Sequence, residues 1–141
     1  MSKTTTLAEI NRNPLNIRYT PSNQWKGQAS QNKGFCVFKS NSYGIRAGFI
    51  ILTNYIKNGI NTIRDIVSRW APPCENNTSA YVDFVSSETL IAPDAILTDK
   101  TIDDYWTKIM IIKAMAKMES GQTFDEQQIN LFINYPEKYE D

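Results

Sequence analysis

The chain has 141 residues, 41% of them hydrophobic, which suits one domain with a single core. Fifteen basic residues balance fifteen acidic residues, and this neutrality argues against nucleic acid as a partner. Histidine is absent, which excludes Ser-His and Cys-His nucleophilic sites and the usual zinc sites. Acid–base chemistry must then come from carboxylates, Tyr, Lys or Cys, and we expect no metal and no organic cofactor.

Residues 1–9 are polar and lack an apolar stretch after a basic start, so no secretory signal is expected. The longest nearly uncharged apolar run, Gly48 to Ile56, is too short to span a bilayer. We therefore expect a protein made in the cytoplasm, with no membrane partner, that reaches a cell-wall target through a virion, lysis or dedicated secretion. Cys36 and Cys74 fit no metal-binding spacing, and we expect buried free thiols rather than a disulfide.

The N-terminal quarter predicts little regular structure. Residues 1–34 are rich in Asn, Gln, Ser and Thr, and we expect a flexible segment over residues 1–10 and one short strand at residues 16–19. The apolar run FCVF at residues 35–38, followed by Lys, Ser and Asn, predicts a strand that enters a turn. A short β-hairpin, or separate strands, is therefore expected near residues 16–38.

The rest of the chain shows helical periodicity bounded by caps and breakers. The expected helices run from Ser42 to Asn58-Gly59, from Asn61 or Thr62 to Pro72-Pro73, across Tyr81, Phe84 and Val85, from Thr98 or Thr101 to about Glu119, and from about Asp125 to Asn134. These elements predict a mainly α (α+β) fold in which residues 1–141 form a single domain.

Glu119 stands at the end of a helix that is apolar almost all the way round, as expected of a central core helix. At about 100° per residue it falls on the same side as Ile112 and Ala116, so its carboxyl group should point partly inward. The helix dipole and burial both disfavour a negative charge there and raise the pKa of the carboxyl group. A glycosidase needs such a protonated carboxyl group as its general acid, although a surface glutamate compensated by Lys117 is the competing interpretation.

The segment NPLNIRYTPSNQWKGQ at residues 13–28 mixes amide side chains with aromatic faces, a mixture that carbohydrate sites use. The candidate substrate-binding residues are Asn13, Asn16, Tyr19, Trp25 and Gln28 in this segment, with Trp70 and Tyr81 from later helices. The competing interpretation is a plain loop anchored by Trp25, with Tyr81 as a core residue. Glu75 is either a second carboxylate in the cleft or only a first-turn residue of the next helix.

Three blocks of the chain resemble small phage and prophage proteins that are often labelled virion structural protein or lysozyme. NPLNIRYTPSNQWKGQ and GFCVFKSNSYGIRAGFIILTNYI are similar to their N-P-G-N-I-R, W-x-G and F-x-x-F-x-S-x-x-x-G-I-R-A motifs. NGINTIRDIVSRWAPPCENNTSAYVDFV resembles them throughout, and IIKAMAKMESGQTF is similar to their I-I-x-x-E-x-G-x-x-P-Y ending. The chain departs from the pattern at Leu15, which replaces a glycine, and at Thr123-Phe124, which replaces Pro-Tyr.

A second resemblance, to bacterial glucosaminidases and lytic transglycosylases, concerns the mechanism. Those enzymes carry E-S-G at a helix end, followed by W-x-G and F-x-x-Y-x-S, whereas here the E-S-G block at 119–121 comes last. The reversed order is what a circularly permuted lysozyme-like fold would give. The resemblance implies Glu119 as the catalytic acid and a cleft formed by Asn13, Asn16, Trp25 and Tyr81.

The implied function is a peptidoglycan glycan-strand hydrolase (a muramidase or glucosaminidase) or a lytic transglycosylase of phage or prophage origin. Glu119 would protonate the glycosidic oxygen between N-acetylmuramic acid and N-acetylglucosamine, and Glu75 would position water; without Glu75, substrate assistance or transglycosylation would complete the reaction. Peptidoglycan glycan strands are the implied partner, with a virion or secretion apparatus as a further one. The alternative is a non-catalytic virion structural or glycan-binding protein, and a toxin delivered between bacteria would share the chemistry of the enzyme.

Overall fold

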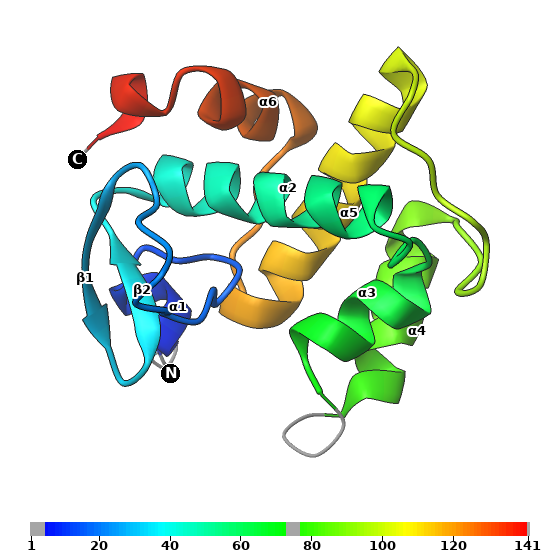
Figure 1. Ribbon diagram of the computed structural model, residues 1–141, viewed down its shortest axis with the longest axis horizontal. Coiled ribbons are helices and arrows are strands. Elements are labelled where there is room, and N and C mark those ends of the chain that lie inside the picture. Colours follow the sequence, from blue (N-terminus) through cyan, green and yellow to red (C-terminus); the bar gives the residue numbers. More distant parts are fainter. Residues whose placement is uncertain (1–4, 73–76, 141) are drawn as a thin grey trace.

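The computed structural model describes residues 5–72 and 77–140 (Figure 1). Its elements are α1 (Leu7–Ile10), β1 (Gln28–Asn32), β2 (Phe35–Phe38), α2 (Asn41–Lys57), α3 (Ile63–Trp70), α4 (Thr78–Thr89), α5 (Ile102–Ser120), α6 (Glu126–Asn134) and the 3-10 helix η1 (Pro136–Tyr139). The chain is therefore mainly helical with a small two-stranded antiparallel sheet, as the sequence predicts.

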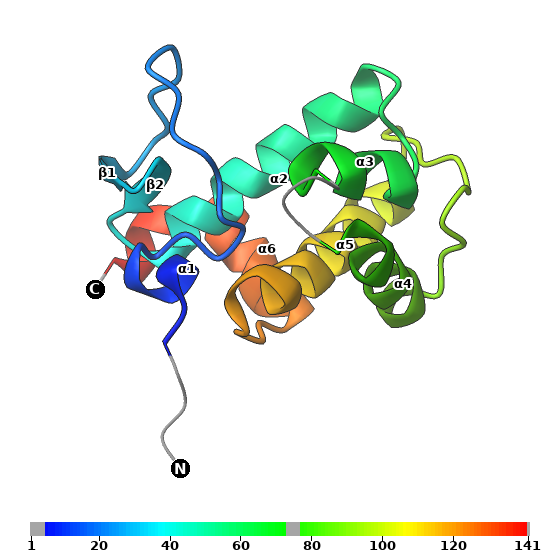
Figure 2. The same cartoon turned by 90° about the horizontal axis from the view of Figure 1, so that it is seen from below.

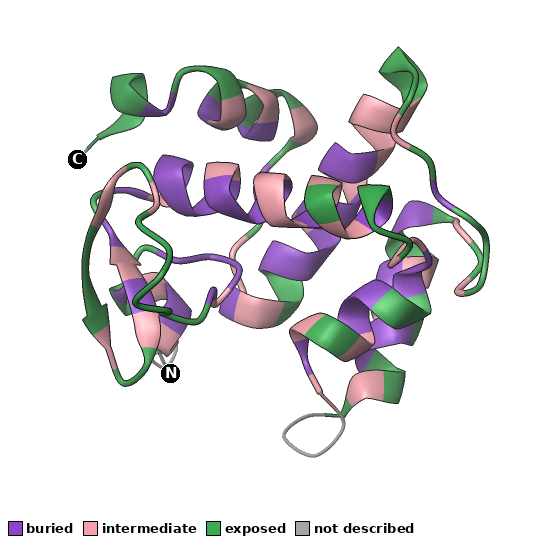
Figure 3. Ribbon diagram, viewed as in Figure 1, coloured by how far each residue is buried: buried purple, intermediate pink, exposed green. Residues whose placement is uncertain are grey.

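The helices pack around α5, which contacts α1, α2, α4 and α6. The hairpin lies at one end of α2, and α3 and α4 lie at its other end (Figures 1 and 2). Buried residues gather where α2, α3, α4 and α5 meet (Figure 3). None of the helices described here combines the length and apolar character that a membrane crossing requires.

The central helix α5 is bounded by the two signals that its sequence carries. The Thr101 side chain accepts a hydrogen bond from the backbone N–H of Asp104, and the Asp104 side chain accepts one from the backbone N–H of Thr101, which together form a capping box. Gly121 ends the helix in the left-handed conformation, at φ +76°. The predicted helix from Thr101 to Glu119 is thus confirmed, and its buried side chains make it the core helix that was expected.

The hairpin differs from the expectation in its first strand. Strand β1 is almost wholly polar and pairs antiparallel with β2, from Asn32 opposite Phe35 to Gln28 opposite Phe38. Lys33 and Gly34 both have positive φ, at 54° and 87°, which is the backbone of a two-residue hairpin turn.

The predicted strand at residues 16–19 is reduced to one isolated bridge, between Arg18 and Phe35. It still lies against the second strand, because the backbone N–H of Cys36 donates to the Ile17 carbonyl at 3.0 Å. Cys36 is a buried free thiol, as predicted, and Cys74 lies outside the described residues.

Helix α1 lies inside the segment for which flexibility was expected. Thr6 is its N-cap and forms a capping box with Glu9. The Thr6 hydroxyl also donates to the Ser120 carbonyl, at 3.1 Å, and so satisfies an acceptor at the end of α5. Ala8 is fully buried. The N-terminal residues from Thr6 onward are thereby attached to the end of the helix that carries Glu119.

Two glycines of α2 allow the loop before the hairpin to lie directly on the helix. A Cβ atom at Gly48 would stand 1.9 Å from Leu15 Cδ1, and one at Gly44 would stand 2.9 Å from Pro14 Cδ. Leu15 is fully buried at this contact. The loop can therefore approach α2 only because these positions lack side chains.

We expect Gly48→Ala to destabilise the protein by about 1–3 kcal/mol, because overpacking at Leu15 outweighs the higher helix propensity of alanine. Urea unfolding followed by circular dichroism measures this change. In a Leu15→Ala background the same substitution should cost much less, since the clashing atoms are gone. An equal cost in both backgrounds would contradict the contact.

Candidate functional site

The carboxyl group of Glu119 lies at the end of α5, between the N-terminal loop and α4. Asn16 donates from Nδ2 to Glu119 Oε1 at 3.4 Å, although the two residues are 103 positions apart in sequence. The Tyr81 hydroxyl, from α4, also lies close to this carboxyl group but does not reach hydrogen-bonding geometry. The structure thus brings together three of the residues that the sequence singled out.

Burial raises the pKa of Glu119, in the direction that the sequence predicts. Tyr81, Asn16 and the positive charge of Arg18 each act against this shift by favouring the ionised form, but burial outweighs them. Burial also raises the pKa of Tyr81 well above its ordinary value, and the neighbouring Glu119 adds to that shift. The tyrosine therefore stays protonated, as a hydroxyl group next to a carboxyl group that resists ionisation.

Two polar atoms beside Glu119 have no hydrogen-bond partner among the described residues. They are the Asn16 side-chain oxygen and the Tyr81 hydroxyl, and both are buried. Asn16 also adopts a left-handed backbone, at φ +53°, which is uncommon for a residue other than glycine. Buried polar atoms are usually paired, and strained backbone tends to persist at functional sites, so both features favour a role in binding.

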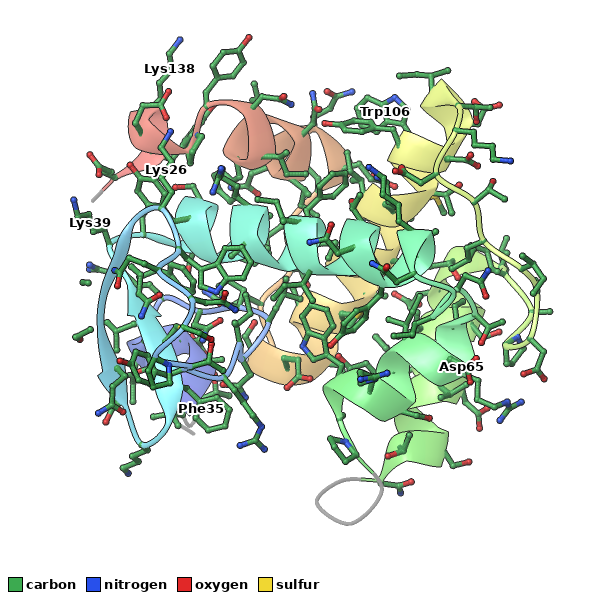
Figure 4. The ribbon with its side chains drawn as sticks, viewed as in Figure 1. Lys26, Phe35, Lys39, Asp65, Trp106 and Lys138 are labelled. Carbon is green, nitrogen blue, oxygen red and sulfur yellow. The ribbon has the colours of Figure 1, made fainter. Side chains whose placement is uncertain are left out.

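A cavity of about 560 Å³ opens next to this group, with Asn16 in its wall. It lies between the loop before the hairpin and the helices α2 and α3. Figure 4 labels Phe35, next to the hairpin turn, and Asp65, on α3, for orientation. Glu119 is not itself a lining residue of the cavity, but it accepts a hydrogen bond from Asn16, which is one.

Aromatic side chains form much of the cavity wall. Trp25, Tyr55 and Trp70 all line it and are half-buried. Tyr55 and Trp70 meet edge to face, with ring centroids 5.9 Å apart. The indole N–H of Trp70 donates to the Leu15 carbonyl at 2.8 Å, which fixes the orientation of the ring in the cavity wall.

The other predicted site residues lie elsewhere. Asn13 is fully buried, and its amide bonds to the Ile17 backbone and to the Cys36 carbonyl at 2.9–3.0 Å, so it holds the loop in place. Tyr19 and Gln28 line a separate hollow beside β1. Glu75 lies outside the described residues.

Most lining residues were not predicted from the sequence, and those among them with charged or aromatic side chains are Arg18, Tyr55 and Arg69. Arg18 follows Ile17 in the NIRY stretch and stacks its guanidinium group over Phe35, 5.1 Å from the ring centroid. Arg69 directly precedes Trp70, so the Arg-Trp pair at the end of α3 was the available signal. Within the described parts of the chain, no three His, Cys, Asp or Glu side chains gather as a metal site would require.

Comparison with known proteins places the chain among phage proteins. It is 39% identical over 124 residues to Protein P5 of Pseudoalteromonas phage PM2, and the match covers 82% of this chain and 74% of that protein. The chain belongs to the family of Protein P5. No family model matches it. The relationship supports the phage or prophage origin that the sequence resemblance implies.

We expect Glu119→Gln to stabilise this member of the P5 family at neutral pH. The folded-state pKa of Glu119 is raised, so ionisation costs folding free energy above that pKa, and the cost vanishes below the ordinary carboxyl value of about 4.3. Urea unfolding between pH 3 and pH 8 should therefore show a gain that shrinks as the pH falls. Glu88→Gln, at an exposed position of α4, is the control. A gain independent of pH would contradict the buried charge.

We expect Arg18→Gln to raise the pKa of Glu119 further, because the substitution removes a positive charge that favours the ionised form. The measurement is a titration of the Glu119 carboxyl carbon by NMR. Arg12→Gln, in the same loop, is the matched control, since Arg12 is not among the groups that shift Glu119. An unchanged titration in Arg18→Gln would show that Arg18 exerts no such influence.

Proposed function

We propose that this protein cleaves the glycan strands of peptidoglycan, with Glu119 as the general acid. The observation that carries the proposal is the position of a carboxyl group whose pKa is raised, 3.4 Å from the amide of Asn16, beside an aromatic cavity. Such a group retains a proton at higher pH than an ordinary glutamate and can transfer it to a glycosidic oxygen.

The cavity has the size and chemistry that a glycan needs. Its volume of about 560 Å³ is within the usual range for ligand sites, roughly 300–1,000 Å³. The faces of Trp25 and Trp70 suit the C–H faces of sugar rings, and the amides of Asn16, Asn23 and Asn54 suit their hydroxyl groups. The same wall thus provides both kinds of contact that a sugar offers.

The surroundings of Glu119 favour a reaction in which one carboxyl group acts twice. No aspartate or glutamate is among the described lining residues of the cavity. Glu119 would donate its proton to the leaving oxygen as the bond from the anomeric carbon breaks. A hydroxyl group of the same sugar would then bond to that carbon and return its proton to Glu119. This sequence is a transglycosylation; hydrolysis would instead need a water positioned by another group, such as Glu75.

A circularly permuted lysozyme-like arrangement fits this proposal, because the end of α5 meets a loop from the start of the chain at the site. The target implied is the cell wall, reached from a virion, during lysis or through a secretion apparatus.

We expect Glu119→Gln to lower the rate of glycan release from peptidoglycan sacculi by roughly 10²–10⁴-fold, the usual contribution of general acid catalysis. Mass spectrometry of the soluble products measures release and identifies the bond cleaved. Glu88→Gln, which removes an exposed carboxylate from α4, should release glycans at the wild-type rate.

The product ends distinguish the mechanisms. Transglycosylation gives fragments lighter by one water than those of hydrolysis. Wild-type protein that binds sacculi but releases nothing would contradict the enzymatic proposal and favour the glycan-binding alternative.

A further inference from the structure

The cavity beside Glu119 has a charge that differs from that of the whole chain. The chain as a whole carries no net charge, with fifteen basic and fifteen acidic residues. The described residues that line the cavity include two arginines, Arg18 and Arg69, and no aspartate or glutamate. A pocket of this kind attracts an anionic group and repels a cationic one.

The guanidinium group of Arg69 is accessible at the cavity wall. Arg69 stands in the last turn of α3, is exposed, and forms no ion pair or hydrogen bond with any residue that the structure describes. Asp65, one turn earlier, shares a neighbouring hollow with it, but the two side chains do not form an ion pair. Figure 4 shows Asp65 toward the side of α3 that faces away from the hairpin.

The other arginine of the same helix provides a contrast. Arg64 is fully engaged with Asp94, through Nε to Oδ1 at 2.9 Å and Nη2 to Oδ2 at 3.1 Å, and it does not line the cavity. Helix α3 thus carries one guanidinium group that binds the segment after α4 and one that lines the cavity. The C-terminal end of a helix favours a positive charge, which suits an arginine at this position.

The position of Arg69 among the aromatic rings indicates which part of a ligand it would contact. Its charge acts on Tyr55, which meets Trp70 edge to face in the wall. Sugar rings that lie against these aromatic faces would place a group that projects from the ring edge near the guanidinium fork. That fork matches a carboxylate in shape and charge, whereas a sugar hydroxyl would use only one of its donors.

We infer that the cavity takes a glycan that carries carboxylate groups, and that Arg69 binds one of these carboxylates. The inference rests on the proposed function and specifies its substrate: glycan strands whose lactyl groups are free carboxylates, as they are once the stem peptides that are amide-linked to them have been removed, rather than strands that still carry peptides or a neutral glycan. Arg18 also lines the cavity, with its guanidinium group stacked over Phe35.

The test compares three soluble glycans of equal length by isothermal titration calorimetry. One alternates N-acetylglucosamine with N-acetylmuramic acid, the second is the same glycan with its carboxylates converted to amides, and the third is an oligomer of N-acetylglucosamine. Glu119→Gln protein is used, so that no ligand is cleaved. The carboxylate glycan should bind roughly fivefold more tightly than the amidated form, the upper range for an exposed ion pair, and this preference should weaken in high salt.

Arg69→Gln should abolish the preference, so that the carboxylate and amidated glycans bind with equal affinity. Arg69→Lys should retain part of it, because lysine keeps the charge but loses the fork. Arg64→Gln is the matched control on the same helix and should keep the full preference. Unfolding curves establish that each variant is folded.

The outcomes separate this inference from the proposed function. Equal binding of the carboxylate and amidated glycans, or a preference that survives Arg69→Gln, would overturn the role of Arg69 while leaving the glycan site intact. A preference that depends on Arg69, in a protein whose wild type releases nothing from sacculi, would support the inference and overturn the enzymatic proposal. Absence of binding to all three glycans would overturn both.

Discussion

The close packing of the loop at residues 13–17 against α2 is the constraint on which the candidate site depends. Gly48 leaves room for the side chain of Leu15, and the buried amide of Asn13 bonds to Ile17 and Cys36. These contacts fix the loop on both sides of Asn16, which is held at a positive φ with its amide at Glu119. The backbone strain at Asn16 is thus supported by buried contacts of its neighbours, as positions in sparsely populated conformations require.

The end of α5 combines features that reduce stability with features that suit chemistry. A half-buried carboxyl group in the last turn opposes the helix dipole, and its partners offset only part of the cost of burial. Asn16 and Tyr81 each retain a buried polar atom without a described partner. Such unpaired groups cost folding free energy, and they are tolerated where a ligand can use them. The N-cap of α1 stabilises the same helix end, because the Thr6 hydroxyl donates a hydrogen bond to the Ser120 carbonyl.

Much of the helical framework could be predicted, because its signals are local. Caps at Thr62 and Thr101 and the glycine at 121 place helix ends at or within a residue of where they occur. Strand β1 could not be predicted from periodicity, since its side chains are polar and it is specified by the turn at Lys33 and Gly34. The short helix α1 is stabilised by its contact with α5, which lies more than a hundred residues away in sequence.

The candidate site was predicted only in part, because some of its features depend on local signals and others on the fold. The inward direction of Glu119 follows from helix geometry. Residue type alone, by contrast, could not decide whether Asn13 lines the cleft. Asparagines suit both turns and sugars, and only the fold separates Asn13, whose amide is fully used by the backbone, from Asn16, whose oxygen is not. The order of the motifs along the chain does not determine the site either. The contact between Asn16 and Glu119 spans 103 residues and forms only on folding, so the same site can form whether the loop precedes or follows α5 in the chain. The site requires that Leu15 can reach α2, and Gly48 leaves the space that its side chain fills.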